Sequence, residues 1–265
     1  MLFQLTGEPV SIRTEFYNQK TIGILGGMSN HATGEYYRLL NDQLAEANNG
    51  NTGEIAIVSV NYGNIEHFVF NDLWSEAEAY LAEKLDRLEA ARPDVVLCAS
   101  NSMHLAFEPV ISKRQTPYIH IVDPTGHAIR EAGISRIGFL GTRFTMNSTK
   151  MHRRYLERWG VEIIVPDEQD RDLIDHITLQ ELCHGIVSPE SKSEALDVVA
   201  DLEERGAQGI ILGCTELCLL LRPEDVPHLP AFDTTALHIA AAVDFVRGDD
   251  SLVSIGSRLR LAVGG

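Results

Sequence analysis

The amino-acid sequence predicts an α/β protein of two similar Rossmann-like domains, each built around a parallel sheet. Two observations support this prediction. Strand-like runs that are apolar throughout alternate with helical patterns, as expected where helices cover both faces of a parallel sheet. The second half also repeats the first, because "TIGILGG" at 21–27 resembles "RIGFLGT" at 136–142, and "PDVVLCASNS" at 93–102 resembles "AQGIILGCTE" at 207–216.

One offset relates both pairs of segments. Ile22 and Ile137 lie about 115 positions apart, and Ser100 and Cys214 lie almost the same distance apart. A common offset indicates internal duplication of a βαβ-type unit, with the two copies related by a pseudo-twofold axis. Chance similarity between Rossmann-like strands is the alternative explanation.

The expected elements follow in order along the chain. In the first half we expect a strand ending in a glycine turn, then a helix, a strand, a helix and two strands, at 21–27, 35–47, 54–62, 73–91, 94–100 and 118–123. In the second half the expected strands are 136–142, 161–166 and 209–215, and the expected helices are 148–160 and 193–207. These elements predict a first domain at 1–122 plus 232–265 and a second at 123–231.

Charge and composition exclude several classes of function. The chain has 265 residues, 44% of them hydrophobic, and a formal net charge of −16, which repels nucleic-acid phosphates and anionic lipid. No run of 18 apolar residues exists, and the N-terminus lacks the pattern of a signal peptide. The four cysteines have no zinc or disulfide spacing, and no histidine pair has metal-ligand spacing. We therefore expect a reduced, cytoplasmic protein without a metal site.

Short polar sequences follow the last strand of each half. Residues 100–102 come after one strand and 214–216 come after the other. Ligands of parallel sheets bind at the carboxyl ends of the strands. If the halves pack about a pseudo-twofold axis, the two strand ends face each other, and the active site lies in the cleft between the domains.

Five motifs in order resemble the aspartate/glutamate racemase family, whose members work without pyridoxal phosphate. They are "TIGILGGMSNHATGEYYRLLND", "SNSMH" in place of the usual Cys-Asn-Thr-Ala-His, "GTRFTMNS", an intact "GCTEL" and "FDTTALHIAAAV", and they cover about residues 20–247. The resemblance implies a two-base racemase that removes an α-proton on one face of an amino acid and returns one on the other. It also implies that no cofactor is needed and that the chain forms a homodimer.

The resemblance assigns the acid/base pair to Cys214 and Ser100. The family usually has two cysteines, but the first position holds Ser100, and Cys98 lies two residues earlier inside the strand, where a small buried hydrophobe is the usual role. A hydroxyl is a weak base unless a neighbour accepts its proton. By analogy with family members that carry a hydroxyl here, Cys214 is the base toward L-amino acids, and exchange from the L-enantiomer is expected to be faster. Cys183 and Cys218 are expected to be buried hydrophobes.

Further residues are assigned to the substrate by the same motifs. These are Met28, Asn101, Ser102, Thr142, Thr145, Thr215 and Glu216. His104 either positions a neighbour or is a satisfied residue of the first helical turn.

Two family cations that bind a distal carboxylate are replaced in this chain. A rough alignment places Phe68 and Leu173 there, with Arg143 and His67 as candidate substitutes. The sequence therefore does not identify the substrate side chain, which could be neutral or larger than that of aspartate.

Three other functions compete with racemisation. A decarboxylase or cis–trans isomerase of the same superfamily would use the single thiol of Cys214. A catalytically silent relative would bind an amino acid without exchanging its α-proton. A purely structural role fits poorly with the intact "GCTE" sequence.

Overall fold

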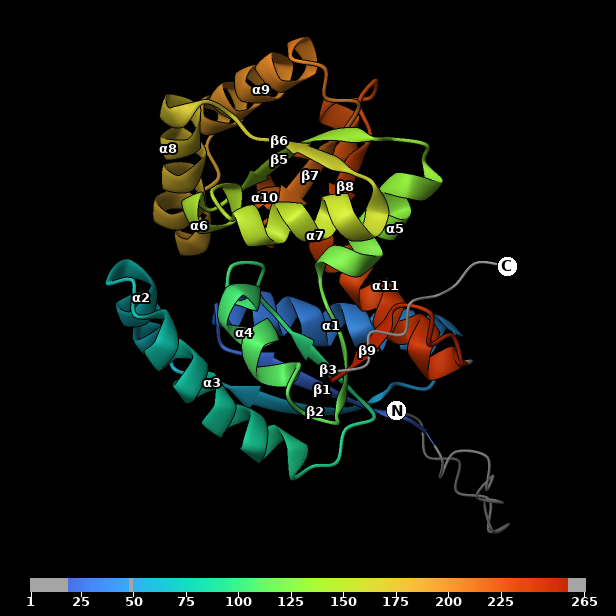
Figure 1. Ribbon diagram of the computed structural model, residues 1–265. Helices are drawn as coiled ribbons and strands as arrows, with labels where there is room; N and C mark the ends of the chain where they lie inside the picture. The colour runs from blue at the N-terminus through green and yellow to red at the C-terminus, as the bar shows by residue number, and fades with distance from the viewer. Residues whose placement is uncertain (1–18, 48–49, 257–265) are drawn as a thin grey trace, which may run out of the picture.

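Two sheets covered by helices make up the computed structural model, which describes residues 19–47 and 50–256 (Figure 1). Within these residues, the first sheet has the strand order β2-β1-β3-β4-β9 and the second has the order β6-β5-β7-β8. Leaving out β9, each sheet arranges its strands in the order second, first, third, fourth. The predicted fold class is confirmed, and the common strand order agrees with an internal duplication.

The first sheet is parallel except at one edge. Its strands are β1 (Thr21–Gly26), β2 (Glu54–Ser59), β3 (Val95–Cys98), β4 (Pro117–Ile119) and β9 (Val253–Ile255). β1 lies between β2 and β3, with Ile24 opposite both Ile57 and Leu97, while β9 runs antiparallel to β4. Because β1 and β3 have neighbours on both sides and helices on both faces, they are apolar throughout.

The second sheet is entirely parallel within the described residues. Its strands are β5 (Arg136–Gly141), β6 (Glu162–Ile164), β7 (Ile210–Gly213) and β8 (Ala231–Asp233). β5 occupies the position that β1 has in the first sheet, and Phe139 lies opposite Ile211 of β7. The carboxyl ends of β3 and β7 therefore carry the two polar sequences singled out above.

The helices lie around and between the sheets (Figure 1). They are α1 (Asn30–Ala47), α2 (Tyr62–Phe70), α3 (Trp74–Glu89), α4 (His104–Ile111), α5 (Val122–Glu131), α6 (Arg143–Met146), α7 (Thr149–Trp159), α8 (Glu168–His176), η2 (Ile177–Glu181), η3 (Leu182–His184), α9 (Pro189–Glu204), α10 (Leu217–Leu220), η4 (Pro223–Asp225) and α11 (Thr234–Arg247). α11 packs against α1 and α5, so the chain returns to the first sheet after β8. The ends of the predicted first domain, 1–18 and 257–265, lie outside the described residues. No helix in the described part of the chain is long and apolar enough to cross a membrane.

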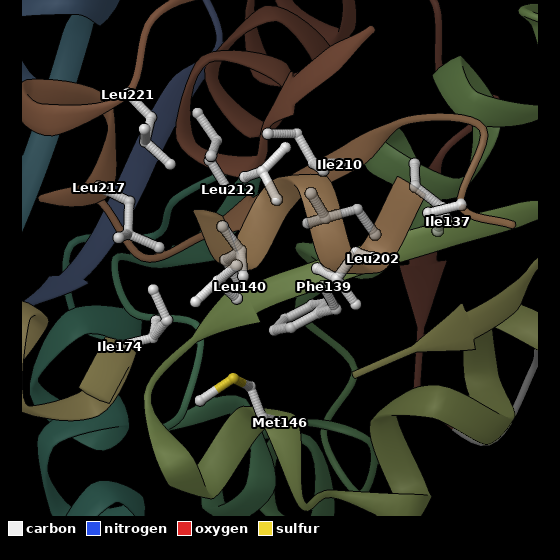
Figure 2. Packing of buried hydrophobic residues seen from close by; sticks show 14 of the residues in the cluster. Ile137, Phe139, Leu140, Met146, Ile174, Leu202, Ile210, Leu212, Leu217 and Leu221 are labelled. Carbon is white, nitrogen blue, oxygen red and sulfur yellow. The ribbon is translucent and has the colours of Figure 1, made fainter. Parts of the chain in front are cut away.

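The core of the second sheet shows why the strand pattern is apolar on both faces. Figure 2 shows Phe139 and Leu140 of β5, whose side chains leave opposite faces of the strand, together with Leu202 of α9 and Met146 of α6. Phe139, Leu140 and Leu202 are fully buried. Truncating such a leucine to alanine costs about 2–5 kcal/mol of the free energy of unfolding.

Some elements are shorter than the sequence predicts. The strand expected at 118–123 ends at Ile119, and α5 begins at Val122. The carbonyl of His120 accepts the N–H of Asp123 at 2.8 Å, which turns the backbone into the helix. The expected strand at 54–62 ends at Ser59 because Asn61 caps α2, its side chain accepting the N–H of Gly63.

Candidate active site

The loop after β3 holds Ser100 in a fixed, nearly buried position. Its side-chain oxygen accepts the N–H of Met103 at 3.3 Å, and its carbonyl accepts Nδ1–H of His104 at 2.6 Å. Nε2 of His104 accepts the N–H of Ile121 at 3.2 Å, which fixes the ring as the neutral Nδ1–H tautomer. Burial, aided by repulsion from His238, lowers the pKa of His104 to about 3. His104 therefore positions the Ser100 backbone as an uncharged group.

The loop after β7 presents Cys214 beside a buried carboxylate. Gly213 is required before it, because a Cβ there would lie 2.4 Å from the ring of Phe139. Sγ of Cys214 donates to Oε2 of Glu216 at 3.0 Å, and the Thr215 hydroxyl donates to the same oxygen. Glu216 is thereby aimed at the thiol.

The thiol of Cys214 is protonated in this arrangement. Burial raises its pKa well above the usual value, and the negative charge of Glu216 and its hydrogen bond raise it further. A thiol that donates to a carboxylate can act as an acid, and it becomes a base once Glu216 has accepted its proton.

The loop after β1 joins the first sheet to this carboxylate. Gly27 has φ of +88°, and a Cβ there would lie 2.3 Å from the carbonyl oxygen of Val60, so only glycine fits. The turn places Met28 and Ser29 at the cleft, and the Ser29 hydroxyl donates to Oε1 of Glu216 at 3.0 Å. Both oxygens of Glu216 therefore accept hydrogen bonds.

The start of α11 ties the two strand ends together. Nδ2 of Asn101 donates to the hydroxyl of Thr234 at 2.9 Å, and that hydroxyl donates to the carbonyl of Leu212 at 3.0 Å. Asp233 caps the helix by accepting the N–H groups of Thr235 and Ala236. The loop after β3 is thus held against β7 by one buried threonine.

A single cavity brings most of the predicted residues together. It has a volume of about 680 Å³ including its open mouth. The predicted residues that line it are Met28, Ser100, Asn101, Ser102, Thr142, Cys214, Thr215 and Glu216. Thr145 is the exception, because it is fully buried and its hydroxyl donates to the carbonyl of Thr142 at 2.8 Å.

Residues that the sequence did not indicate form the rest of the wall. They are Ser29, Tyr62, Ile65, Glu66, Val69, Phe70, Met103, Phe144, Leu179, Gly213 and Cys183. Most come from α2 and from the irregular turns η2 and η3. One pattern in the sequence could have indicated part of this wall: Ile65 and Val69 are apolar residues at helical spacing, and Glu66 lies beside Ile65.

The residues discussed as cation replacements lie elsewhere. Phe68 packs against Tyr80, with ring centroids 5.5 Å apart, and Leu173 packs on the core of the second sheet. Arg143 forms ion pairs with Glu168 and Asp172. None of these, nor His67, lines the cavity, and among the described residues that do, there is no lysine, arginine or histidine.

The other cysteines differ from one another. Cys98 is fully buried in β3, and burial raises its pKa. Cys218 is half-buried and does not line the cavity, whereas Cys183, expected to be a buried hydrophobe, lies on the cavity wall, where burial and nearby carboxylates raise its pKa to about 12. Within the described residues, no group of three or more His, Cys, Asp or Glu side chains is arranged to hold a metal ion.

Comparison with known proteins places the chain in a family and finds related structures. A family model described as Asp/Glu/Hydantoin racemase matches residues 25–242. A candidate Asp/Glu racemase from Yersinia pestis is 37% identical with a TM-score of 0.80, over 86% of this chain and 99% of that one. An aspartate racemase homologue from Pyrococcus horikoshii OT3 is 27% identical with a TM-score of 0.73, over the same shares. An uncharacterized protein from the pnlA 3' region of Pectobacterium carotovorum subsp. carotovorum is 32% identical over 107 residues, which are 40% of this chain and 69% of that protein.

Proposed function

Because the chain belongs to the Asp/Glu/hydantoin racemase family and is an amino-acid racemase, we propose that it moves the α-proton of its substrate between Cys214 and Ser100. One observation carries this proposal: a thiol from the second sheet and a hydroxyl from the first line the same cavity. Groups on opposite sides of one carbon can remove and return a proton without the substrate turning over.

The reaction of an L-amino acid begins at Cys214. The thiol gives its proton to Oε2 of Glu216, and the thiolate then takes the α-proton. The resulting carbanion receives the hydroxyl proton of Ser100 on its other face. Water reprotonates the Ser100 oxygen, and the hydroxide formed is neutralised by the proton held on Glu216. All protons are thereby accounted for.

The carbanion is stabilised through the substrate carboxylate. Its charge spreads onto the carboxylate oxygens, where donors fixed before the reaction lower the barrier. Asn101, Ser102 and Thr142 line the cavity, and we assign the donors to their amide and hydroxyl groups. Thr215 and Ser29 are committed to Glu216 instead, so we assign them to holding the base.

The two faces of the cavity are unequal under this proposal. Cys214 has a carboxylate within hydrogen-bond distance, whereas the Ser100 oxygen accepts only a backbone N–H among its described contacts. A hydroxyl without a base is a poor proton acceptor. We therefore propose that L-substrates are deprotonated faster than D-substrates.

Conversion of L- to D-amino acid, followed by chiral chromatography, tests the proposed function. Cys214→Ala is expected to lower the rate at least about 10²-fold, whereas Cys218→Ala, a cysteine that does not line the cavity, should retain the activity. Carbon dioxide release from a malonate analogue, without racemisation, would instead identify a single-thiol decarboxylase. Binding without α-proton exchange would identify a silent relative.

We propose a cytoplasmic homodimer that acts in D-amino-acid metabolism, on the resemblance to the family. We also propose that 1–122 with 232–265 and 123–231 are the domains, which the packing of α11 on α1 supports. Light scattering of the purified chain tests the first proposal, since a mass near 29 kDa rather than twice that value would contradict the dimer.

A further inference from the structure

The cavity has a polar end and an apolar end. Cys214, Ser100 and Ser102 lie at the strand tips, where the reacting carbon is placed by the proposed function. Most of the remaining wall comes from α2, α6, η2 and η3. Phe70 of α2 and Phe144 of α6 meet edge to face, with centroids 6.2 Å apart, and so bridge the cleft beside the cavity. A side chain leaving the reacting carbon therefore enters an apolar enclosure.

Hydrocarbon surface dominates that enclosure. Ile65, Val69, Phe70, Phe144 and Leu179 line it. Ile65 is almost fully buried, so its place in the wall is fixed by the core of the first sheet. Such a wall gains free energy by covering apolar atoms of a ligand, but it offers no hydrogen bond to a carboxylate.

The charged side chains that line the cavity, Glu66 and Glu216, are both acidic. Glu66 of α2 lines the cavity, and no ion pair or hydrogen bond to its carboxylate is found in the described part of the chain. Burial raises the pKa of Tyr62 and of Cys183 to about 12, with smaller contributions from Cys183 and Glu66 for Tyr62, and from Glu216 and Glu66 for Cys183. With no lysine, arginine or histidine among the described lining residues, nothing neutralises a second carboxylate there.

Two basic residues next in sequence to the cavity, Arg143 and His67, are directed elsewhere, whereas His184, which follows Cys183, lines an adjoining hollow with His31 and Glu66. Arg143, next to the cavity residue Thr142, forms ion pairs with Glu168 and Asp172 of α8. His67, next to Glu66, lies against Asn71 on the exposed side of α2. A negatively charged side chain held within the cavity itself would therefore leave water without gaining a cationic partner among the lining residues.

We propose that the substrate is an amino acid with a hydrocarbon side chain that carries no negative charge, and that Glu66 with the cation-free wall rejects aspartate and glutamate. The inference rests on the proposed function, since it takes the strand tips as the place of the reacting carbon. The end of the hydrocarbon is neutral or cationic, and a substrate panel distinguishes the two.

The test is α-proton exchange in heavy water, followed by proton NMR, with L-leucine, L-methionine, L-lysine, L-aspartate and L-glutamate. We expect kcat/KM for at least one of the first three to exceed that for both acidic amino acids by at least about tenfold. A lysine rate above the leucine and methionine rates would identify a cationic end, and the reverse order a neutral one. Faster exchange of aspartate or glutamate would overturn the inference and leave the proposed function intact.

Two variants test whether Glu66 is the side chain that rejects acidic substrates. Glu66→Gln, an exposed change of similar size, should raise the ratio of glutamate to leucine exchange by about tenfold. Glu76→Gln, also at an exposed position but on α3, should leave that ratio unaltered. An unaltered ratio in Glu66→Gln would contradict the role of Glu66.

Thermal stabilisation by each amino acid separates this inference from the proposed function. If no amino acid exchanges its α-proton, the proposed function fails. Stabilisation by leucine, methionine or lysine, but not by glutamate, would then still support the specificity. Stabilisation by glutamate alone would overturn it.

Discussion

Replacing Asp123 with alanine is expected to destabilise the protein strongly, because this carboxylate is buried among cations. It is fully buried at the start of α5, and it accepts two hydrogen bonds from Arg154, at 3.0 and 2.7 Å, and one from Trp159 at 3.2 Å. Arg158 also lies 3.0 Å away. Arg154 in turn donates to Glu108 of α4, so this cluster links α4, α5 and α7.

The size of the effect follows from burial. Removing one partner of a buried ion pair costs about 3–5 kcal/mol, because the remaining charge stays desolvated and unpaired. For a chain of this size, that loss lowers the melting temperature by roughly 6–20 °C. Asp42→Ala is the matched control, since Asp42 pairs with Arg38 on the exposed face of α1, where side chains are more than half exposed. We expect it to change the free energy of unfolding by less than about 1 kcal/mol.

Urea unfolding followed by circular dichroism, with calorimetry for the melting temperature, measures both variants. A loss below about 1 kcal/mol for Asp123→Ala, or equal losses for the two variants, would contradict the cost assigned to the unpaired buried arginines. It would mean that Arg154 and Arg158 find other partners or become hydrated at little cost.

Three further predictions concern the site. Ser100→Cys should raise α-proton exchange of the D-substrate at least about tenfold, since a thiol is a better base than a hydroxyl, and an unchanged NMR rate would count against Ser100 as the second group. Glu216→Gln should speed iodoacetamide alkylation of Cys214 at pH 8, because burial and then the Glu216 charge and hydrogen bond raise the pKa of that thiol; slower alkylation, read by mass spectrometry, would disagree. Burial lowers the pKa of His104 from 6.5 to about 3, so the unfolded chain binds more protons between these pH values, and the free energy of unfolding should fall as the pH decreases through that window. Urea unfolding at pH 7, 6 and 5 should show a shallower fall in His104→Gln, and an equal slope would contradict the role of burial.

The sequence predicted the sheets because their signal is local. The strands that contain Ile22 and Ile137 are buried on both faces, so each is a continuous apolar run followed by a glycine turn. Parallel topology then places the ends of β3 and β7 on the ligand-binding edge, and this is how Ser100 and Cys214 could be singled out before any coordinates.

The side-chain end of the cavity could not be predicted in the same way. Leu179 lies in η2, a π-helix, and Cys183 lies in the short 3₁₀ turn η3, and neither conformation has the 3.6-residue period that marks an ordinary helix. Phe70 is 60% exposed and lines the cavity, whereas an apolar residue in a sequence is ordinarily assigned to the core. Thr145 was assigned from a motif, but the turn of α6 directs its hydroxyl to the backbone.

Deuterium incorporation at Cα, measured from both enantiomers of the best substrate in heavy water, tests the roles proposed for Cys214 and Ser100. We expect faster initial incorporation into the L-enantiomer, and a loss of at least about 10²-fold in Cys214→Ala while Cys218→Ala retains exchange. Equal initial rates for the two enantiomers would contradict the inequality of thiol and hydroxyl. Undiminished exchange in Cys214→Ala would contradict the assignment of the thiol itself.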